Sequence, residues 1–212
     1  MSSEQLSRPH AGCLDERNFH ADPVEQFRTW LSEAMSAGIH EPCGMALGTT
    51  TADGRPSVRF VLMRGFDSRG FVFYTHYDSR KAAELESNPR GALAFYWHEQ
   101  GRQVRIEGAV ERTSAEESDA YFDSRPFGSR LSAIASPQSR VVANRGELEQ
   151  AVRELMSRYR HAGERVPRPD SWGGYRLVPQ AIEFWQRGPH RLHDRLRYAR
   201  RGEGWVLERL AP

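Results

Sequence analysis

The sequence predicts a mainly β protein with peripheral helices, in which the strands close into a barrel. Nine short segments with apolar residues at strand spacing are separated by turn signals. The clearest hairpin is centred on Asp53-Gly54, a dipeptide that favours a two-residue turn. Apolar positions alternate on both sides of this turn, over 45–49 before it and over 58–62 after it. The remaining strands are expected at 71–75, 91–97, 103–112, 175–178, 181–185, 192–198 and 205–210.

The helices are predicted from capping signals and apolar periodicity. The first begins at Asp22, which can cap it, with Pro23 at the first helical position and Glu25 completing a capping box. Apolar residues then recur on one face until Gly38 ends the helix. A short helix is expected from about Ser79 to a point before Pro89.

Two further helices are expected in the second half of the chain. Thr113 and Glu116 have the spacing of a capping box and open a helix that runs through Phe122. A longer helix is expected over 144–161, with an apolar stripe from Leu148 to Tyr159. Residues 125–143, rich in Ser, Arg and Pro, are expected to be irregular.

The length of 212 residues suits one domain. Residues 1–21 are polar and lack periodicity, so we expect a mobile N-terminal arm there and a single domain over 22–212. The start of the chain has no secretory signal, and no apolar run approaches the roughly 20 residues that span a bilayer. With only two cysteines, which cannot form a disulfide scaffold, the chain is expected in the reducing cytoplasm, without a membrane partner.

The charge balance argues against a nucleic-acid partner. Lys and Arg total 30 against 28 Asp and Glu, a formal net charge of +2, whereas a nucleic-acid binder needs a clustered basic excess. Of the cations only Lys81 is a lysine, so the chain is rich in the rigid, forked donors that suit carboxylate and phosphate. The eight His residues include no metal-ligand pair with a nearby third ligand, so no metal site is expected.

Three clusters carry candidate chemistry, although each alone is more typical of a solvated charged face. The strand 59–64 has an arginine at each end. The segment 79–81 places Ser, Arg and Lys at the start of a predicted helix, where free N–H groups and two cations favour a phosphate. The segment 183–195 brings aromatic surface beside two Arg and a His. Gly173-Gly174 is interpreted as a turn before a strand.

These clusters resemble the pyridoxamine 5′-phosphate oxidase family of FMN-dependent split-barrel flavoenzymes. The resemblance extends over nearly the whole chain from residue 22 onward. The motifs that carry it lie at 59–64, 73–75, 79–81, 102–104, 124–126, 138–139, 172–175, 183–186, 191–195 and 208–212. It implies the fold class of an FMN-binding split β-barrel, and a homodimer whose two FMN sites form between the subunits.

The resemblance also implies the site residues. Contact with FMN is implied for Arg59, Phe60, Val61, Leu62, Met63, Arg64, Tyr74, Thr75, Arg80, Lys81, Gln103, Gln138, Ser139, Trp185 and Arg195. Contact with the substrate, a small aromatic molecule lying over the flavin, is implied for Arg64, Tyr121, Arg125, Ser129, Arg191 and His193. Of these, Arg191 and His193 are the expected catalytic residues; they flank Leu192 in a predicted strand and would share one face.

The implied chemistry is transfer of a hydride from the substrate to the flavin, followed by reoxidation by dioxygen with release of hydrogen peroxide. The cofactor performs the redox step and the protein positions it. Arg80 and Lys81 would hold the flavin phosphate at the helix start, and Gln103 has an amide that can pair with the flavin ring.

The sequence departs from the vitamin-B6 members of the family in its substrate half. Arg64 stands where those members usually carry Lys, and His76 where they usually carry Asn. Residues 129–134 read Ser-Arg-Leu-Ser-Ala-Ile in place of the usual Ser-Gln-[Ile/Leu]-Gly-Ala-[Trp/Val], and residues 1–21 lack the usual Tyr. Thr75-His76 and the segment 38–42 look more like the branch of the family that works in phenazine biosynthesis.

The lead interpretation is therefore an oxidase that aromatises a dihydro- or tetrahydrophenazine carboxylate. On this interpretation pyridoxine 5′-phosphate reduces the flavin slowly or not at all. The alternative is a pyridoxine/pyridoxamine 5′-phosphate oxidase that makes pyridoxal 5′-phosphate, because Tyr121, Arg125, Ser129, Arg191 and His193 also suit a phosphate. A remote alternative is a flavin-binding module without turnover, which would leave the cations beside a substrate-sized slot without a purpose.

Overall fold

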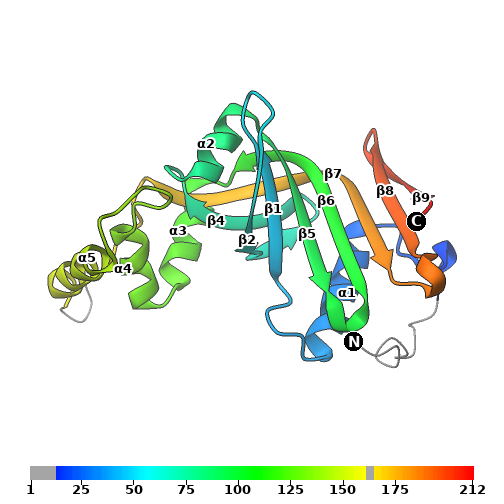
Figure 1. Ribbon diagram of the computed structural model, residues 1–212, viewed down its shortest axis with the longest axis horizontal. Helices are drawn as coiled ribbons and strands as arrows, with labels where there is room; N and C mark the ends of the chain where they lie inside the picture. Colours follow the sequence, from blue (N-terminus) through cyan, green and yellow to red (C-terminus); the bar gives the residue numbers. More distant parts are fainter. Residues whose placement is uncertain (1–12, 161–164) are drawn as a thin grey trace.

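The chain folds around one curled antiparallel sheet with helices at its periphery (Figure 1). The computed structural model describes residues 13–160 and 165–212. The nine-stranded sheet has the order β2-β1-β5-β6-β7-β4-β3, and β8 pairs with β7 and β9. The strands are β1 (Gly44–Thr50), β2 (Pro56–Leu62), β3 (Gly65–Asp67), β4 (Gly70–His76), β5 (Arg90–Trp97), β6 (Arg102–Arg112), β7 (Trp172–Gln186), β8 (Asp194–Arg201) and β9 (Gly204–Arg209). The helices are α1 (Pro23–Ser36), α2 (Arg80–Ser87), α3 (Ala115–Ser124), α4 (Phe127–Ala135) and α5 (Arg145–Arg158).

The sheet forms a split barrel and not the closed barrel that the strand pattern alone predicts. Its two terminal strands, β2 and β3, follow each other in the chain through Met63 and Arg64. One bent segment therefore crosses from one edge of the sheet to the other, where the Arg64 N–H donates to the Val72 carbonyl of β4 (2.8 Å). This bent segment therefore connects the two ends of the curled sheet.

Helix α1 fills the concave side of the curled sheet, as its sequence predicts. The Asp22 side chain accepts a hydrogen bond from the Val24 N–H (2.8 Å), Pro23 occupies the first turn, and Gly38 adopts a positive φ of 71° after the helix. Phe27 is fully buried, and its ring contacts the rings of Phe66, Phe71 and Phe95 at centroid distances of 4.9–5.0 Å. The predicted apolar face, Val24, Phe27, Leu31 and Ala34, is confirmed.

Strand β7 spans the molecule and was wrongly expected as two strands, 175–178 and 181–185. Its 15 residues pair with β4 near one end, with β8 near the other, and with β6 along most of its length. A bulge at Glu107/Gly108 accommodates Pro179, whose ring cannot donate to the ladder. Gly108 permits this contact, because a Cβ there would lie 2.0 Å from the Val178 carbonyl oxygen.

The segments flanking the sheet show three further differences from expectation. Residues 127–135, expected to be irregular, form α4, whose Leu131 and Ala133 are buried in a small cluster with Phe122 and Trp172. Ser114, not Thr113, caps α3, because the Thr113 N–H continues the strand pairing to Gly174. Helix α5 forms as predicted, but none of its residues is buried.

The segment 13–21, expected to belong to a mobile arm, is attached to the sheet. The Leu14 N–H donates to Asp194 (3.1 Å), Arg209 donates to the Leu14 carbonyl (2.6 Å), and the Phe19 ring packs against Phe184. The rest of the expected arm, 1–12, lies outside the described residues.

Gly173-Gly174 does not form the expected turn but lies inside β7. A Cβ at Gly173 would lie 2.0 Å from the Tyr77 hydroxyl, and one at Gly174 would lie 2.4 Å from the Thr113 hydroxyl. The two glycines therefore let neighbouring side chains approach the strand, beside Trp172.

None of the helices in residues 13–160 and 165–212 is both long and apolar enough to cross a membrane. Within the same ranges, no group of three or more His, Cys, Asp and Glu side chains is arranged to hold a metal ion.

Candidate active site

A cavity of about 470 Å³ lies where β2, β4, the start of α2, α3 and the segment 132–138 meet. Its lining contains eleven of the predicted site residues: Arg59, Phe60, Val61, Leu62, Arg64, Tyr74, Thr75, Lys81, Tyr121, Arg125 and Gln138. The curled sheet thus brings together residues that are up to 79 positions apart in sequence. The cavity contains most of the predicted FMN contacts and part of the predicted substrate contacts.

One side of the cavity is built for an anion. The Lys81 Nζ is buried, and it donates to Gln138 Oε1 (2.7 Å) and to the Thr75 hydroxyl (3.1 Å). Burial, followed by the nearby Arg59, lowers the pKa of Lys81 to about 8. Its ammonium group has no carboxylate partner among the described residues, so a bound anion would stabilise its charge.

The start of α2 adds donors to the same side. Ser79 precedes the helix, but its hydroxyl donates to the His76 carbonyl (2.7 Å) and does not cap the helix. The N–H groups of the first turn therefore lack a side-chain cap and can receive an anion. This arrangement supports the predicted phosphate position at 79–81.

The opposite wall is aromatic. The rings of Tyr74 and Tyr121 stack with centroids 3.9 Å apart, and Trp172 stacks on Tyr74 at 5.5 Å. The Arg125 guanidinium lies over the Trp172 ring at 4.8 Å. Burial raises the pKa of Tyr74 to about 12, so its hydroxyl stays protonated near neutral pH. Such a wall can contact a flat aromatic molecule.

Two guanidinium groups at the cavity lack a counter-charge. Burial, and secondarily the neighbouring Arg64, lower the pKa of Arg125. The Arg125 Nη1 is buried and has no hydrogen-bond partner, and in the described ranges neither arginine forms an ion pair. Arg64 is exposed and Arg125 is half-buried, and two cations that border one cavity without a counter-charge favour an anionic group of a ligand.

Several predicted residues lie outside the cavity. Met63 is buried in the core beneath the strand, and Ser129 and Ser139 do not line the cavity. Arg80 points to solvent with 65% of its side chain exposed and pairs with Glu84 (2.8 Å). Direct contact between Arg80 and the phosphate stays a prediction, because in this structure Arg80 is paired with Glu84 and does not line the cavity.

The other predicted residues form a second cluster on β6, β7 and β8. Gln103 lies opposite Trp185, which lies opposite Arg195 on β8. Arg195 forms an ion pair with Glu183 (2.8 Å), and the His193 ring packs against Trp185 with centroids 4.7 Å apart. This second cluster comprises Gln103, Trp185, Arg191, His193 and Arg195.

The expected strand at Arg191 and His193 is wrong, so the argument that they share a strand face fails. Residues Pro189–Arg191 form a 3₁₀ turn, and β8 begins only at Asp194. His190 and Arg191 have positive φ angles of 52° and 65°, which an extended strand does not permit. The two residues remain neighbours because the turn is held by the Gly188 N–H, which donates to His193 Nδ1 (3.1 Å).

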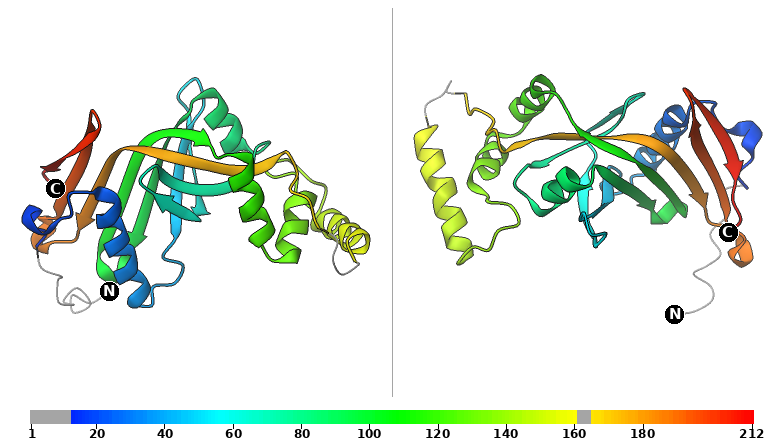
Figure 2. Two further views of the ribbon diagram at one scale, coloured as in Figure 1. Left: turned by 180° about the vertical axis from the view of Figure 1, so that it is seen from behind. Right: turned by 90° about the horizontal axis from the view of Figure 1, so that it is seen from above.

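The cavity and the second cluster lie at opposite ends of β7. Trp172 lines the cavity at the first residue of the strand, and Trp185 lies at its second-last residue. A strand of 15 residues extends for roughly 45 Å along the chain. Figures 1 and 2 show α3–α5 at one end of β7 and β8–β9 at the other. One copy of the chain therefore cannot place both clusters around one small ligand.

The sequence argument missed some cavity residues. His76, Trp172, Ser132 and Ser136 line the cavity but were not proposed as site residues. His76 is buried, and burial, then the charges of Lys81 and Arg125, lower its pKa, which favours neutral imidazole. The signal for Trp172 was present in the Trp-Gly-Gly-Tyr motif, but the signal for the two serines was hidden in a segment that was not recognised as helical.

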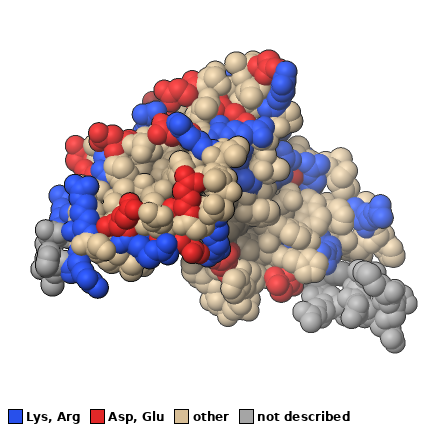
Figure 3. Space-filling view, turned by 60° about the vertical axis from the view of Figure 1, so that its left-hand side comes forward, with Lys and Arg blue, Asp and Glu red and all other residues tan. Residues whose placement is uncertain are grey.

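Acidic and basic side chains are mixed on one face of the molecule (Figure 3). On the face shown in Figure 3, Lys and Arg side chains are interspersed with Asp and Glu. This distribution matches the balanced composition of 30 cationic and 28 acidic residues.

Two family models match this fold and these residues. Residues 31–185 match the model described as pyridoxamine 5′-phosphate oxidase. Residues 172–212 match the model described as the pyridoxine 5′-phosphate oxidase C-terminal dimerisation region, and that range contains Trp185, Arg191, His193 and Arg195.

Individual relatives are similar over nearly the whole chain. A pyridoxine/pyridoxamine 5′-phosphate oxidase of Rubrobacter xylanophilus is 57% identical, with 94% of this chain and 91% of the relative covered. One from Bordetella petrii is 56% identical, with 94% and 93% covered. The crystal structure of PhzG from Burkholderia lata in complex with tetrahydrophenazine-1-carboxylic acid is 35% identical, covers 94% of this chain and 98% of that chain, and has a TM-score of 0.88.

The split barrel, its cationic and aromatic cavity and these matches define an FMN-dependent oxidase. The chain belongs to the pyridoxamine 5′-phosphate oxidase family.

Proposed function

We propose that this chain is a pyridoxine/pyridoxamine 5′-phosphate oxidase that acts as a homodimer. It oxidises the phosphorylated vitamin-B6 alcohol or amine to pyridoxal 5′-phosphate. The observation that carries the proposal is the Arg64–Arg125 pair, which borders the cavity without a carboxylate partner in the described part of the chain. Relatives that are 56–57% identical carry this activity in their names, which supports the same substrate.

The donor set of the cavity fits FMN. Lys81, Arg59, Gln138, Thr75 and the start of α2 supply donors for a terminal phosphate. The strand 60–62 would lie along the flavin, with the aromatic wall beyond it. FMN held by these residues would supply the redox chemistry, as acceptor of a hydride from the substrate and as donor of two electrons and two protons to dioxygen, which gives hydrogen peroxide. The chain binds and orients both molecules and excludes water from between them.

The charge of the substrate distinguishes the two candidate reactions. A phosphate monoester carries about −1.5 to −2 charges near neutral pH and three acceptor oxygens. It can therefore balance both the Arg64 and Arg125 guanidinium groups, whereas a carboxylate carries one negative charge and leaves the second guanidinium unbalanced. Tyr121, at the same wall, adds a hydroxyl donor. This argument reverses the preference for a phenazine carboxylate drawn from the sequence.

The homodimer follows from the distance between the two clusters. We propose that the second cluster of one copy completes the cavity of the other, so that Gln103, Trp185 and Arg195 reach the FMN. Arg191 and His193 would then reach the substrate from the second copy. The match of 172–212 to a dimerisation region supports this arrangement.

A second candidate function is oxidation of a reduced phenazine carboxylate. The structural similarity to PhzG, with a TM-score of 0.88, favours it. His76, neutral and buried in the cavity wall, is the residue of this chain that could contact a larger, unphosphorylated ring system.

Anaerobic flavin reduction tests the substrate proposal. Mixed without oxygen, pyridoxine 5′-phosphate is expected to reduce the bound FMN at a rate of order 1–10 per second. Dihydro- or tetrahydrophenazine-1-carboxylate should reduce it at least tenfold more slowly at the same concentration. The measurement is the loss of flavin absorbance in a stopped-flow instrument, with unphosphorylated pyridoxine as the control. Faster reduction by the phenazine would replace the proposed function with the second candidate.

FMN affinity is expected to fall as the pH rises from 7.5 to 9.5. The pKa of Lys81 in the free protein is about 8, lowered first by burial and then by Arg59. Lys81 donates to the phosphate only when protonated, and the bound phosphate raises its pKa, so binding takes up a proton. The dissociation constant should rise by up to about tenfold per pH unit in this range. A Lys81→Arg variant, cationic throughout, should show no such rise in a fluorescence titration; an equal slope in both proteins would contradict the role of Lys81.

A further inference from the structure

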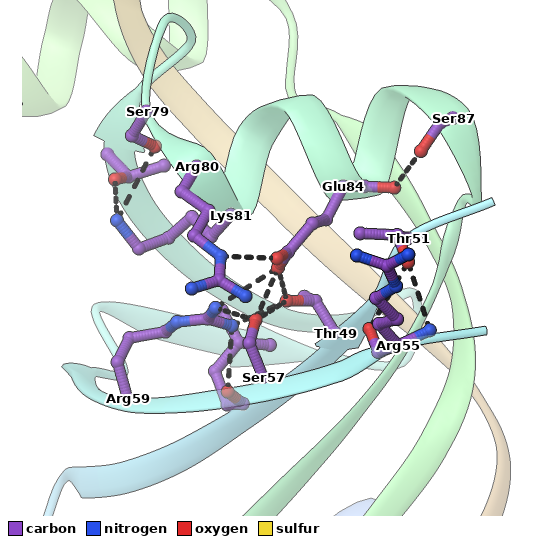
Figure 4. A network of polar contacts seen from close by, with 12 residues as sticks. Thr49, Thr51, Arg55, Ser57, Arg59, Ser79, Arg80, Lys81, Glu84 and Ser87 are labelled. Atoms are coloured by element: carbon purple, nitrogen blue, oxygen red, sulfur yellow. Dashed lines mark hydrogen bonds and ion pairs between the residues drawn. The ribbon is translucent and has the colours of Figure 1, made fainter. Parts of the chain in front are cut away.

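Glu84 is a buried carboxylate that the proposed activity does not itself use. It lies on α2 with 3% of its side chain exposed. Four side chains donate to it: Thr49 (2.5 Å), Ser57 (2.6 Å), Arg80 (2.8 Å) and Arg59 (3.1 Å). Figure 4 shows the carboxylate at the centre of these contacts, which join α2 to β1 and β2.

The contacts fix the orientation of Arg59. One terminal nitrogen of its guanidinium donates to the Leu47 carbonyl (3.0 Å) and to the Thr49 hydroxyl (2.5 Å). The other terminal nitrogen donates to Ser57 and to Glu84. Both terminal nitrogens of Arg59 are thus held by protein groups, while its side chain still lines the cavity. Of the four partners of Arg59, one is Glu84 itself, and two are the hydroxyls of Thr49 and Ser57, which both donate to Glu84.

The Glu84 carboxylate also places a negative charge among the cations at the start of α2. Burial favours its neutral form, but hydrogen bonds from Ser57, Thr49, Arg80 and Arg59 outweigh burial and lower the pKa of Glu84 to about 2. Arg59 and Arg80 therefore share a single fixed negative charge, and Lys81 follows Arg80 on the same helix with its ammonium group directed elsewhere. The excess of two positive charges matches the charge of a phosphate monoester.

We propose that Glu84 is a positioning residue for the FMN phosphate. It holds Arg59 in the orientation that receives the phosphate, and it anchors Arg80 beside the start of α2. This inference rests on the proposed function, because it takes the flavin phosphate to bind at Lys81 and Arg59. It assigns to Arg80 an indirect role, through Glu84, in place of the direct contact expected from the sequence.

The test compares FMN with riboflavin, which lacks the phosphate. In Glu84→Gln, the negative charge is lost and the amide NH₂ must face either Arg80 or the donors Thr49, Ser57 and Arg59, so Arg59 is held less firmly and FMN affinity is expected to fall about tenfold or more. Riboflavin affinity should change less than twofold. The measurement is the quenching of flavin fluorescence on titration of the full-length, flavin-free chain at fixed salt.

Two further variants make the result specific. Glu86→Gln is the matched control, because Glu86 lies on the same helix, is 67% exposed and pairs with Arg112; it should alter neither affinity. Ser57→Ala keeps the carboxylate and removes one linking hydroxyl, so it should lower FMN affinity by about threefold. It also provides the test if Glu84→Gln fails to fold.

The outcomes distinguish a failure of the proposed FMN phosphate site from a failure of the proposed role of Glu84. If the wild-type chain binds FMN no more tightly than riboflavin, the phosphate site of the proposed function is wrong. If the wild type prefers FMN and Glu84→Gln and Ser57→Ala keep that preference unchanged, the role of Glu84 is wrong. Equal losses for FMN and riboflavin would indicate a purely structural role and would also overturn the inference.

Discussion

Replacing Lys81 by Met is expected to leave the purified protein largely free of FMN. The buried ammonium group of Lys81 donates to Gln138 and Thr75 and has no carboxylate partner among the described residues, so its charge is available to the phosphate. A hydrogen bond to a charged group contributes roughly 1.5–3 kcal/mol, which corresponds to a 10- to 150-fold rise in the dissociation constant. The measurement is the FMN released on denaturation, together with a fluorescence titration.

Arg80→Ala is the control for this prediction. Arg80 carries a positive charge next to Lys81 in sequence, but its side chain is 65% exposed and does not line the cavity. The loss of affinity should therefore be clearly smaller than in Lys81→Met. An equal or larger loss in Arg80→Ala would show that Arg80 contacts the phosphate directly, as the sequence alone suggests.

Replacing Arg125 by Met is expected to reduce kcat/KM for pyridoxine 5′-phosphate by roughly 10- to 150-fold. The Arg125 Nη1 has no partner in the described part of the chain, and the guanidinium is held over the Trp172 ring, so the substrate phosphate is its expected partner. FMN content should not change. The measurement is steady-state oxidation, followed by hydrogen peroxide release.

The phosphate-free substrate separates binding of the phosphate from general damage to the site. Wild type and Arg125→Met should oxidise unphosphorylated pyridoxine equally poorly, since Arg125 has no group to contact there. Arg165→Met, which removes an exposed arginine paired with Asp123, should behave as wild type on both substrates. A similar loss on both substrates in Arg125→Met would contradict a phosphate contact.

Local signals in the sequence predicted much of the fold. The start of α1 was predicted because Asp22, Pro23 and the apolar face are encoded within a few residues. Most strands were located by their alternation. Helix α4 was missed because Ser, Gly and Arg obscure its apolar face, and only contacts with Phe122 and Trp172 bury that face. The continuity of β7 depends on a bulge at Gln180, where its register against β6 shifts, and no local pattern reveals this shift.

The candidate site was predicted in part: residues in recognisable motifs were found, and features that depend on the three-dimensional fold were not. Lys81, Tyr74 and Arg125 lie in motifs that resemble the family, and the fold brings them to one cavity. The second cluster lies far from the cavity because β7 is one long strand, and the sequence did not reveal that strand. The turn at Arg191 depends on positive φ angles in two residues that are not glycine, which a pattern of residue types does not predict. Glu84 was missed because its partners come from β1, β2 and α2.

The central claim is that two distant clusters of this chain form one active site across a homodimer. A mixed dimer tests it most directly. One copy carries Lys81→Met in the cavity, and the other carries Arg191→Ala and His193→Ala in the second cluster; different affinity tags allow the mixed dimer to be purified. Each parent homodimer should be inactive, because every site in it carries a defect.

In the mixed dimer, one site combines the intact cavity of one copy with the intact second cluster of the other. The second site carries both defects. The mixed dimer should therefore show about half of the wild-type activity per dimer, because a twofold-symmetric dimer has two equivalent sites. A mixed dimer as inactive as its parents, or a flavin-loaded monomer with full activity, would contradict the claim.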